Sequence, residues 1–247
     1  MESVLNIITL ITSLIALLTL FEMKKQRHAL MLPNVSLNSK YTVFLKLDRR
    51  DLNDNYSIKG CPYRWSKTDE KIEPSDEITL PKYEIDLVNV GNGTATDIQY
   101  EWELDIEYYL NEIEKYKGNC DIEINYIFDQ KRILYKTKYE GLCPRGLESD
   151  DYKISFLQSS QKITIDFSAE FILLFSTLLY VKLINKSKNE KSILYFANNS
   201  SQLPFPDLII RYNDISGKKY KKCFQFKMDF CSLSVDDCSF FIQVIEK

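Results

Sequence analysis

Hydrophobic and polar residues alternate with a period of two along much of the chain, a pattern typical of β-strands with one buried and one exposed face. In residues 98–107 the apolar positions 98, 100, 102, 104 and 106 are interleaved with Gln, Glu and Asp. Similar alternation places these residues on the inner faces of further strands: Tyr83, Ile85, Leu87, Ile122, Ile124, Tyr126, Ile163, Ile165, Phe167, Leu208, Ile210 and Tyr212. The pattern predicts a mainly β fold, either an antiparallel sandwich or a small oligonucleotide-binding-like barrel.

Two segments interrupt this pattern. In residues 107–117, Leu110, Ile113 and Tyr116 have helical spacing and Gly118 is a suitable helix end, so either a short inserted helix or a continued strand fits. Residues 169–181 are mostly apolar, with Glu170 at one edge, and the segment is too short to span a bilayer comfortably. We interpret them as a second inserted helix or a strand of the core, and the alternative is a segment that rests against a membrane.

The N-terminus carries an uncharged apolar run, residues 4–21, which begins at Val4 and ends at Phe21. As a helix with ~1.5 Å rise per residue it would be about 27 Å long, close to the ~30 Å hydrocarbon core of a bilayer. Lys24, Lys25 and Arg27 form a basic flank just beyond it. The pattern predicts a transmembrane anchor in the lipid bilayer with its flank, residues 1–30, followed by one β-rich domain, residues 31–247.

A cleaved secretory signal is the alternative to an anchor. Such a signal has its positive charges before the apolar run and a small-residue cleavage site after it. Here the basic residues come after the run, and no Ala-x-Ala pattern follows Phe21. A retained anchor is favoured, with the N-terminus outside and the domain in the cytoplasm, because basic residues mark the cytoplasmic flank. The oligomeric state stays open.

The predicted compartment determines how the cysteines are interpreted. In a reducing cytoplasm they are expected to be free thiols: Cys61, Cys120, Cys143, Cys223, Cys231 and Cys238. There is no Cys-x-x-Cys pair, and the sole histidine, His28, adjoins the predicted membrane segment. Neither a zinc site nor another metal or cofactor is therefore expected.

The sequence offers little support for catalysis. The predicted domain has no histidine to serve as a general base for a serine or cysteine nucleophile. The pair Gly91 and Gly93 is a weak nucleotide-loop signal, because Thr96 replaces the third glycine and no lysine follows. We predict a non-enzymatic protein.

Two turns organise the domain. Residues 89–98 contain Gly91 and Gly93, which are expected to allow positive φ where the chain reverses between two strands. The sequence Asp-Ile-Ser-Gly at residues 214–217 is expected to close a hairpin. Together with the anchor and its basic flank, residues 212–218 resemble a turn in a diffuse set of uncharacterised single-span bacterial membrane proteins. The resemblance implies a β-rich cytoplasmic domain and no activity.

A cluster of lysines and aromatic residues in positions 218–227 is the strongest chemical signal. As a strand, it would place the aromatic residues 220, 224 and 226 with Lys218 and Lys222 on one face, and Lys219, Lys221 and Lys227 on the other. Rings stack on bases and ammonium groups bind phosphates, so the cluster predicts contact with single-stranded nucleic acid. The alternative is that the rings fill the core while the lysines protect an edge strand. The predicted contact residues are Lys218, Lys219, Tyr220, Lys221 and Lys222, with a second set of Lys131, Arg132 and Tyr135.

The formal net charge of -3 restricts any such surface to a local patch. In length, single anchor and Ile/Lys/Tyr/Asn-rich composition, the chain also resembles the AbiP-type lactococcal abortive-infection proteins, which are membrane-anchored, nucleic-acid-binding phage-resistance factors. That resemblance implies a phage-resistance protein that binds single-stranded nucleic acid. The alternatives are a membrane-tethered adaptor that recruits a protein partner and a membrane-active effector.

Overall fold

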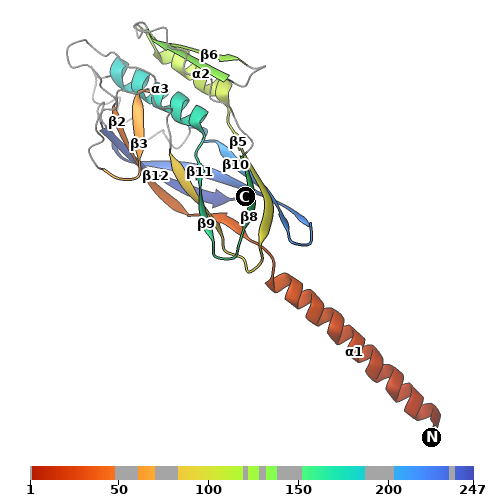
Figure 1. Ribbon diagram of the computed structural model, residues 1–247. Helices are drawn as coiled ribbons and strands as arrows, with labels where there is room; N and C mark the ends of the chain where they lie inside the picture. Colours follow the sequence, from red (N-terminus) through yellow and green to blue (C-terminus); the bar gives the residue numbers. More distant parts are fainter. Residues whose placement is uncertain are drawn as a thin grey trace.

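The chain forms a β-rich body from which one long helix projects (Figure 1). The computed structural model describes residues 2–47, 61–69, 83–118, 122–127, 132–137, 152–186, 203–233 and 237–247. The projecting helix is α1 (Glu2–Leu30). The rest of the described chain contains three antiparallel sheets and two further helices, which confirms the prediction of a mainly β fold with inserted helices.

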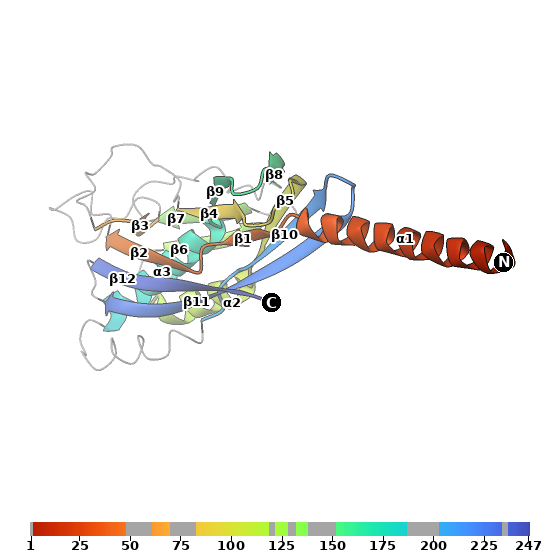
Figure 2. The same ribbon diagram turned by 90° about the horizontal axis from the view of Figure 1, so that it is seen from below.

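The largest sheet has seven strands in the order β3-β2-β12-β11-β10-β5-β8. It is curled like half of a barrel, and its outermost strands, β3 and β8, do not pair with each other in the described part of the chain (Figures 1 and 2). In sheet order its strands are β3 (Tyr63–Ser66), β2 (Lys40–Leu47), β12 (Asp237–Glu246), β11 (Lys219–Leu233), β10 (Asp207–Asp214), β5 (Ala95–Glu103) and β8 (Tyr152–Leu157).

Two smaller sheets accompany it. One has the order β1-β4-β9, with β1 (Val35–Leu37), β4 (Glu84–Asn89) and β9 (Lys162–Asp166), and the other pairs β6 (Ile122–Ile127) with β7 (Arg132–Thr137). The β1-β4-β9 sheet is joined to the seven-stranded sheet by tyrosine hydroxyls. Tyr83 Oη donates to the Thr42 carbonyl at 2.9 Å, and Tyr41 Oη donates to the Asp86 carbonyl at 3.1 Å. Burial raises the pKa of Tyr41 to about 12, so this donor stays protonated at physiological pH.

Helix α3 (Ala169–Lys186) lies in the core, where the side chains from Phe171 to Leu183 are buried. Its aromatic residues surround Trp65 of β3, whose indole N–H donates to Ser176 Oγ at 2.9 Å. This arrangement confirms the interpretation of residues 169–181 as a buried core segment and identifies it as a helix.

Helix α2 (Ile106–Tyr116) packs on α3 and confirms the shorter inserted helix. The Asp105 carboxylate accepts from the Tyr108 N–H at 3.0 Å and caps its N-terminus. The alternating pattern predicted that the preceding strand continues to Ile106, which is wrong, because β5 ends at Glu103, two residues before the cap residue Asp105. A local side-chain hydrogen bond therefore outweighs the period-two pattern over the last positions.

Helix α1 is the helix expected at the N-terminus. All its side chains from Thr9 to Arg27 are exposed, and the hydroxyls of Thr12, Ser13 and Thr19 donate to carbonyls of the preceding turn. No helix in the described part of the chain combines the length and the apolar character needed to cross a membrane.

The glycine-containing turn after β4 has a different role from the predicted one. It does not join two paired strands, because β4 and β5 belong to different sheets. Among the described glycines, positive φ is found at Gly118 and Gly217, and not at Gly91 or Gly93. Instead, a Cβ at Gly93 would overlap the Met31 carbonyl, since this turn packs tightly on the chain that leaves α1. The prediction of glycine-dependent positive φ at this turn is therefore wrong, and close backbone contact is the reason for the glycines.

Candidate functional site

The β10–β11 hairpin carries the predicted lysine cluster, and its turn is fixed by one carboxylate. Asp214 Oδ1 accepts from Ser216 Oγ at 2.6 Å, from Ser216 N–H at 2.9 Å and from Lys218 N–H at 3.0 Å, while its other oxygen accepts from Tyr220 Oη at 3.1 Å. The Ser216 hydroxyl, with the other donors, lowers the pKa of Asp214 to about 2. Gly217 closes the turn at a φ of 84°. The strands next to this turn are therefore held in a defined register.

The aromatic residues of the cluster point into the domain. Phe224 and Phe226 are buried in the core, and the Tyr220 ring stacks on Tyr212 with centroids 5.3 Å apart. Lys222, on the same face, binds Glu246 Oε1 at 2.7 Å and Asn34 Oδ1 at 2.6 Å. The rings therefore belong to the core and are not displayed as an open platform for stacking bases.

Lys219 and Lys221 lie on the outer face of β11 and are exposed. The register places Lys221 directly opposite Arg211 on β10, Arg211 opposite Gln99 on β5, and Gln99 opposite Lys153 on β8. Directly opposite residues of antiparallel strands project from the same face. We call the set Lys153, Gln99, Arg211 and Lys221, with the adjacent Lys219, the basic row.

The charges of the basic row are only partly balanced. Glu101 Oε1 lies 2.6 Å from Arg211 Nη2 and compensates that guanidinium. Asn213, opposite Lys219, donates to Asp97 at 3.1 Å. Lys153, Lys219 and Lys221 form no ion pair within the described residues, so their ammonium groups face solvent.

Sequence reasoning did not find Arg211 or Lys153. The predicted turn at residues 214–217 brings Arg211 near the lysine cluster, but symmetric closure of that turn would pair Arg211 with Tyr220, and only the observed register places it opposite Lys221. Lys153 had no such signal, since β8 is distant in sequence and its position beside β5 is a property of the whole sheet.

In the second predicted basic set, the two described residues are not part of this surface. Arg132 and Tyr135 lie on β7, where they stand opposite Ile127 and Ile124 of β6, and this pair of strands forms a sheet of its own. Lys131 lies outside the described residues. The flank residues Lys24, Lys25 and Arg27 lie on α1, where their side chains are exposed.

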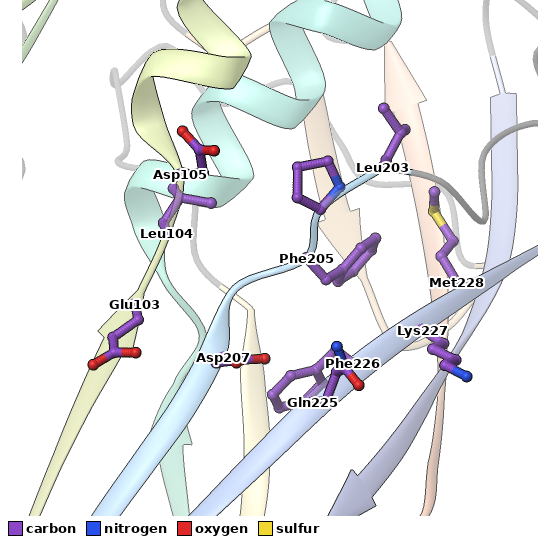
Figure 3. A pocket seen from close by; sticks show the side chains of 11 residues that line it. Glu103, Leu104, Asp105, Leu203, Phe205, Asp207, Gln225, Phe226, Lys227 and Met228 are labelled. Carbon is purple, nitrogen blue, oxygen red and sulfur yellow. The ribbon is translucent and has the colours of Figure 1, made fainter. Parts of the chain in front are cut away.

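A pocket of about 400 Å³ lies at the opposite end of β5, next to the start of α2 (Figure 3). Leu104, Phe205, Phe226 and Met228 form its apolar lining. The carboxylates of Glu103, Asp105 and Asp207 also line it, but Asp105 caps α2 and Asp207 binds Lys247 Nζ at 2.6 Å. These two carboxylates therefore have structural partners.

The described residues contain no group of three or more His, Cys, Asp or Glu side chains that could hold a metal ion. Cys61, Cys223, Cys231 and Cys238 carry free thiols, whereas Cys120 and Cys143 lie outside the described residues. No protein-family model matches the chain, and no curated protein and no solved structure matches it either. The candidate site therefore depends on its own geometry, in which the basic row is the most distinctive chemical feature.

Proposed function

We propose that this chain is a membrane-anchored, non-enzymatic protein whose β-rich domain binds single-stranded nucleic acid through the basic row. The observation that carries the proposal is the alignment of Lys153, Arg211 and Lys221 on neighbouring strands of one sheet face. Neighbouring strands are ~4.8 Å apart, so the row extends about 14 Å across the sheet. A nucleic-acid strand, with its repeated phosphates, would contact several of these cations at once, whereas a single small anion would contact one or two.

The anchoring part of the proposal rests on the sequence of α1, since no helix in the described part of the chain is long and apolar enough to cross a membrane. The sequence has no charge between Val4 and Phe21, and α1 exposes large apolar side chains from Leu10 to Phe21. Exposed apolar surface of this extent is favourable only in contact with lipid or another apolar surface. The basic flank of Lys24, Lys25 and Arg27 supports an orientation with the domain in the cytoplasm, where nucleic acid is within reach.

The mode of binding differs from the one that the sequence suggested. Because Phe224 and Phe226 are buried, recognition depends on phosphate contacts more than on base stacking. Binding of this kind is strongly salt-dependent and has little sequence preference. A part in phage resistance, as the AbiP-like architecture suggests, would use this surface to retain invading nucleic acid at the membrane.

The test uses the full chain in detergent micelles and measures fluorescence anisotropy of labelled single-stranded DNA and RNA across salt concentrations. Lys219→Ala with Lys221→Ala should weaken binding and should reduce the slope of log K against log salt by about 0.7 for each phosphate that the variant no longer neutralises. The matched control is Lys227→Ala, which removes an exposed lysine of the same strand outside the row. Equal binding by the double variant and the wild type, or no salt-dependent binding at all, would contradict the proposal.

The pocket favours a second candidate function, a membrane-tethered adaptor that recruits a protein partner. Its apolar lining and partly exposed carboxylates suit a peptide segment with apolar and basic side chains. Phe205→Ala should then abolish capture of such a partner without affecting nucleic-acid binding, whereas the variants of the basic row should have the opposite effect.

A further inference from the structure

Outside α1, the exposed large apolar residues of the described chain are concentrated at one end of the domain. They are Met31, Val90, Phe156, Ile215 and, less exposed, Ile245. Met31 follows α1 directly, Val90 is in the turn after β4, Ile215 is in the β10–β11 turn, and Phe156 stands opposite Thr96 near the start of β5. Ile215 is 74% exposed at the tip of its hairpin. Four of the five therefore lie at the end from which α1 emerges.

This end is firmly attached to the chain that leaves α1. Val90 N–H donates to the Asn34 carbonyl at 2.9 Å, and Gly93 N–H donates to the Leu32 carbonyl at 3.3 Å. Lys222 Nζ donates to Asn34 Oδ1 at 2.6 Å and brings the β10–β11 hairpin to the same point. Both views show the tip of this hairpin beside the C-terminal end of α1 (Figures 1 and 2).

Basic residues surround the exposed apolar ones. Lys218 and Lys219 follow the Ile215 turn and are exposed, and the exposed Lys24, Lys25 and Arg27 lie on the adjoining part of α1. The Asp214 carboxylate is occupied by the donors of its own turn. Exposed apolar side chains next to lysines are typical of protein surfaces that bind anionic lipid headgroups.

We propose that this end of the domain docks on an anionic lipid surface, with Ile215 entering the interface and Lys218 contacting headgroups. The proposal rests on anchoring by α1. The segment from Glu22 to Leu30 is about 13 Å long at ~1.5 Å per residue, and the headgroup region adds about 5–8 Å on each side of the hydrocarbon core. A helix tilt of about 20° is the average for membrane helices, and a tilt toward the β10–β11 hairpin would bring this hairpin to the bilayer surface.

The test places a tryptophan at the tip, Ile215→Trp, in the full chain reconstituted into vesicles of phosphatidylcholine and phosphatidylglycerol in equal parts. Brominated acyl chains quench tryptophan on contact, and the native Trp65 and Trp102 provide the wild-type background. We expect at least twofold stronger quenching than in the wild type. The matched control, Asp237→Trp, lies beyond the other end of β11 and should show no added quenching. Equal signals from the two variants would overturn the proposal.

Charge dependence provides a second readout. Adding Lys218→Glu to Ile215→Trp should reduce the quenching, as should vesicles of phosphatidylcholine alone, whereas Lys227→Glu should have no effect. If the quenching changes neither with the charge of the lipid nor with Lys218→Glu, the proposed headgroup contact is wrong. Alkaline carbonate extraction of the same vesicles distinguishes a failure of docking from a failure of anchoring. Release of the wild-type chain from the vesicles would disprove the anchor. Retention of the chain, with no quenching of the tryptophan at position 215, would disprove only the docking.

Discussion

Arg211 and Lys221 stand directly opposite each other across the β10–β11 pair. Like charges in this position destabilise a sheet unless an anion compensates them. Glu101 supplies one carboxylate, 2.6 Å from Arg211, whereas Lys221 has no ion pair within the described residues. The outer face of the sheet thus retains uncompensated positive charge, which a bound polyanion would neutralise.

Glu101→Gln should increase the affinity for single-stranded nucleic acid. The substitution removes the Glu101 carboxylate from the side of Arg211 and so removes a negative charge that would repel the bound phosphates. Because an exposed ion pair contributes at most about 1 kcal/mol, the expected gain is up to about fivefold in Kd. Anisotropy titrations of the full chain at constant salt provide the measurement, with Glu103→Gln, two residues further along β5, as the control. Unchanged or weaker binding by Glu101→Gln would show that the ligand does not contact Arg211.

Asp214→Asn should destabilise the protein near neutral pH more than in strong acid. The pKa of Asp214 is lowered to about 2, below its ordinary value of 3.8, so the carboxylate stabilises the fold fully above about pH 4. That contribution is lost as the pH falls from about 4 to 2, because in this range the unfolded chain takes up a proton more readily than the folded state does. Urea unfolding at a series of pH values should show the variant and wild-type curves converging in acid. Asp229→Asn, which loses only an acceptor for Gln243, is the control.

Lys182→Met should loosen the packing of α2 on α3. Lys182 Nζ lies 2.8 Å from Glu112 Oε2 and 4.5 Å from the centre of the Tyr116 ring, and its side chain is only 9% exposed. Burial opposes ionisation of Glu112, but Lys182 and Lys115 outweigh it and lower the pKa of that carboxyl. We expect a loss of about 1–2 kcal/mol in the free energy of unfolding, since the carboxylate loses its buried charged partner and keeps only the exposed Lys115. Lys115→Met, at an exposed position on the same carboxylate, should cost much less, because solvent screens that ion pair.

The strands were predictable where one face is buried and the other is exposed to solvent, because only then do hydrophobic and polar residues alternate with a period of two. The alternation at positions 83–87 and 208–212 corresponds to β4 and β10. The same reasoning failed at Ile106, where capping by Asp105 begins a helix. It could not assign β4 and β5 to different sheets, since sheet membership depends on contacts between distant segments.

The candidate site was predictable only in part for a related reason. The division of residues 219–226 between two faces follows from their spacing, and the structure places the two sets accordingly. Which face is buried depends on the partners of the strand, and these partners direct Phe224 and Phe226 into the core. Lys153 joins the basic row through β8, which no local pattern links to β11.

Gly93→Ala should disrupt the connection between α1 and the domain, whereas Gly217→Ala should be mild. A Cβ at Gly93 would overlap the Met31 carbonyl, a backbone atom that cannot move without shifting the chain at the end of α1. We expect a loss of at least about 2 kcal/mol in the free energy of unfolding. A Cβ at Gly217 would meet no atom within 4 Å, so only the φ of 84° disfavours alanine, at a cost of about 1 kcal/mol. Urea unfolding of the two full-length variants checks the difference. Equal losses in the free energy of unfolding would mean that the turn after β4 can shift away from residues 31–34, and that this contact does not fix the domain to its helix.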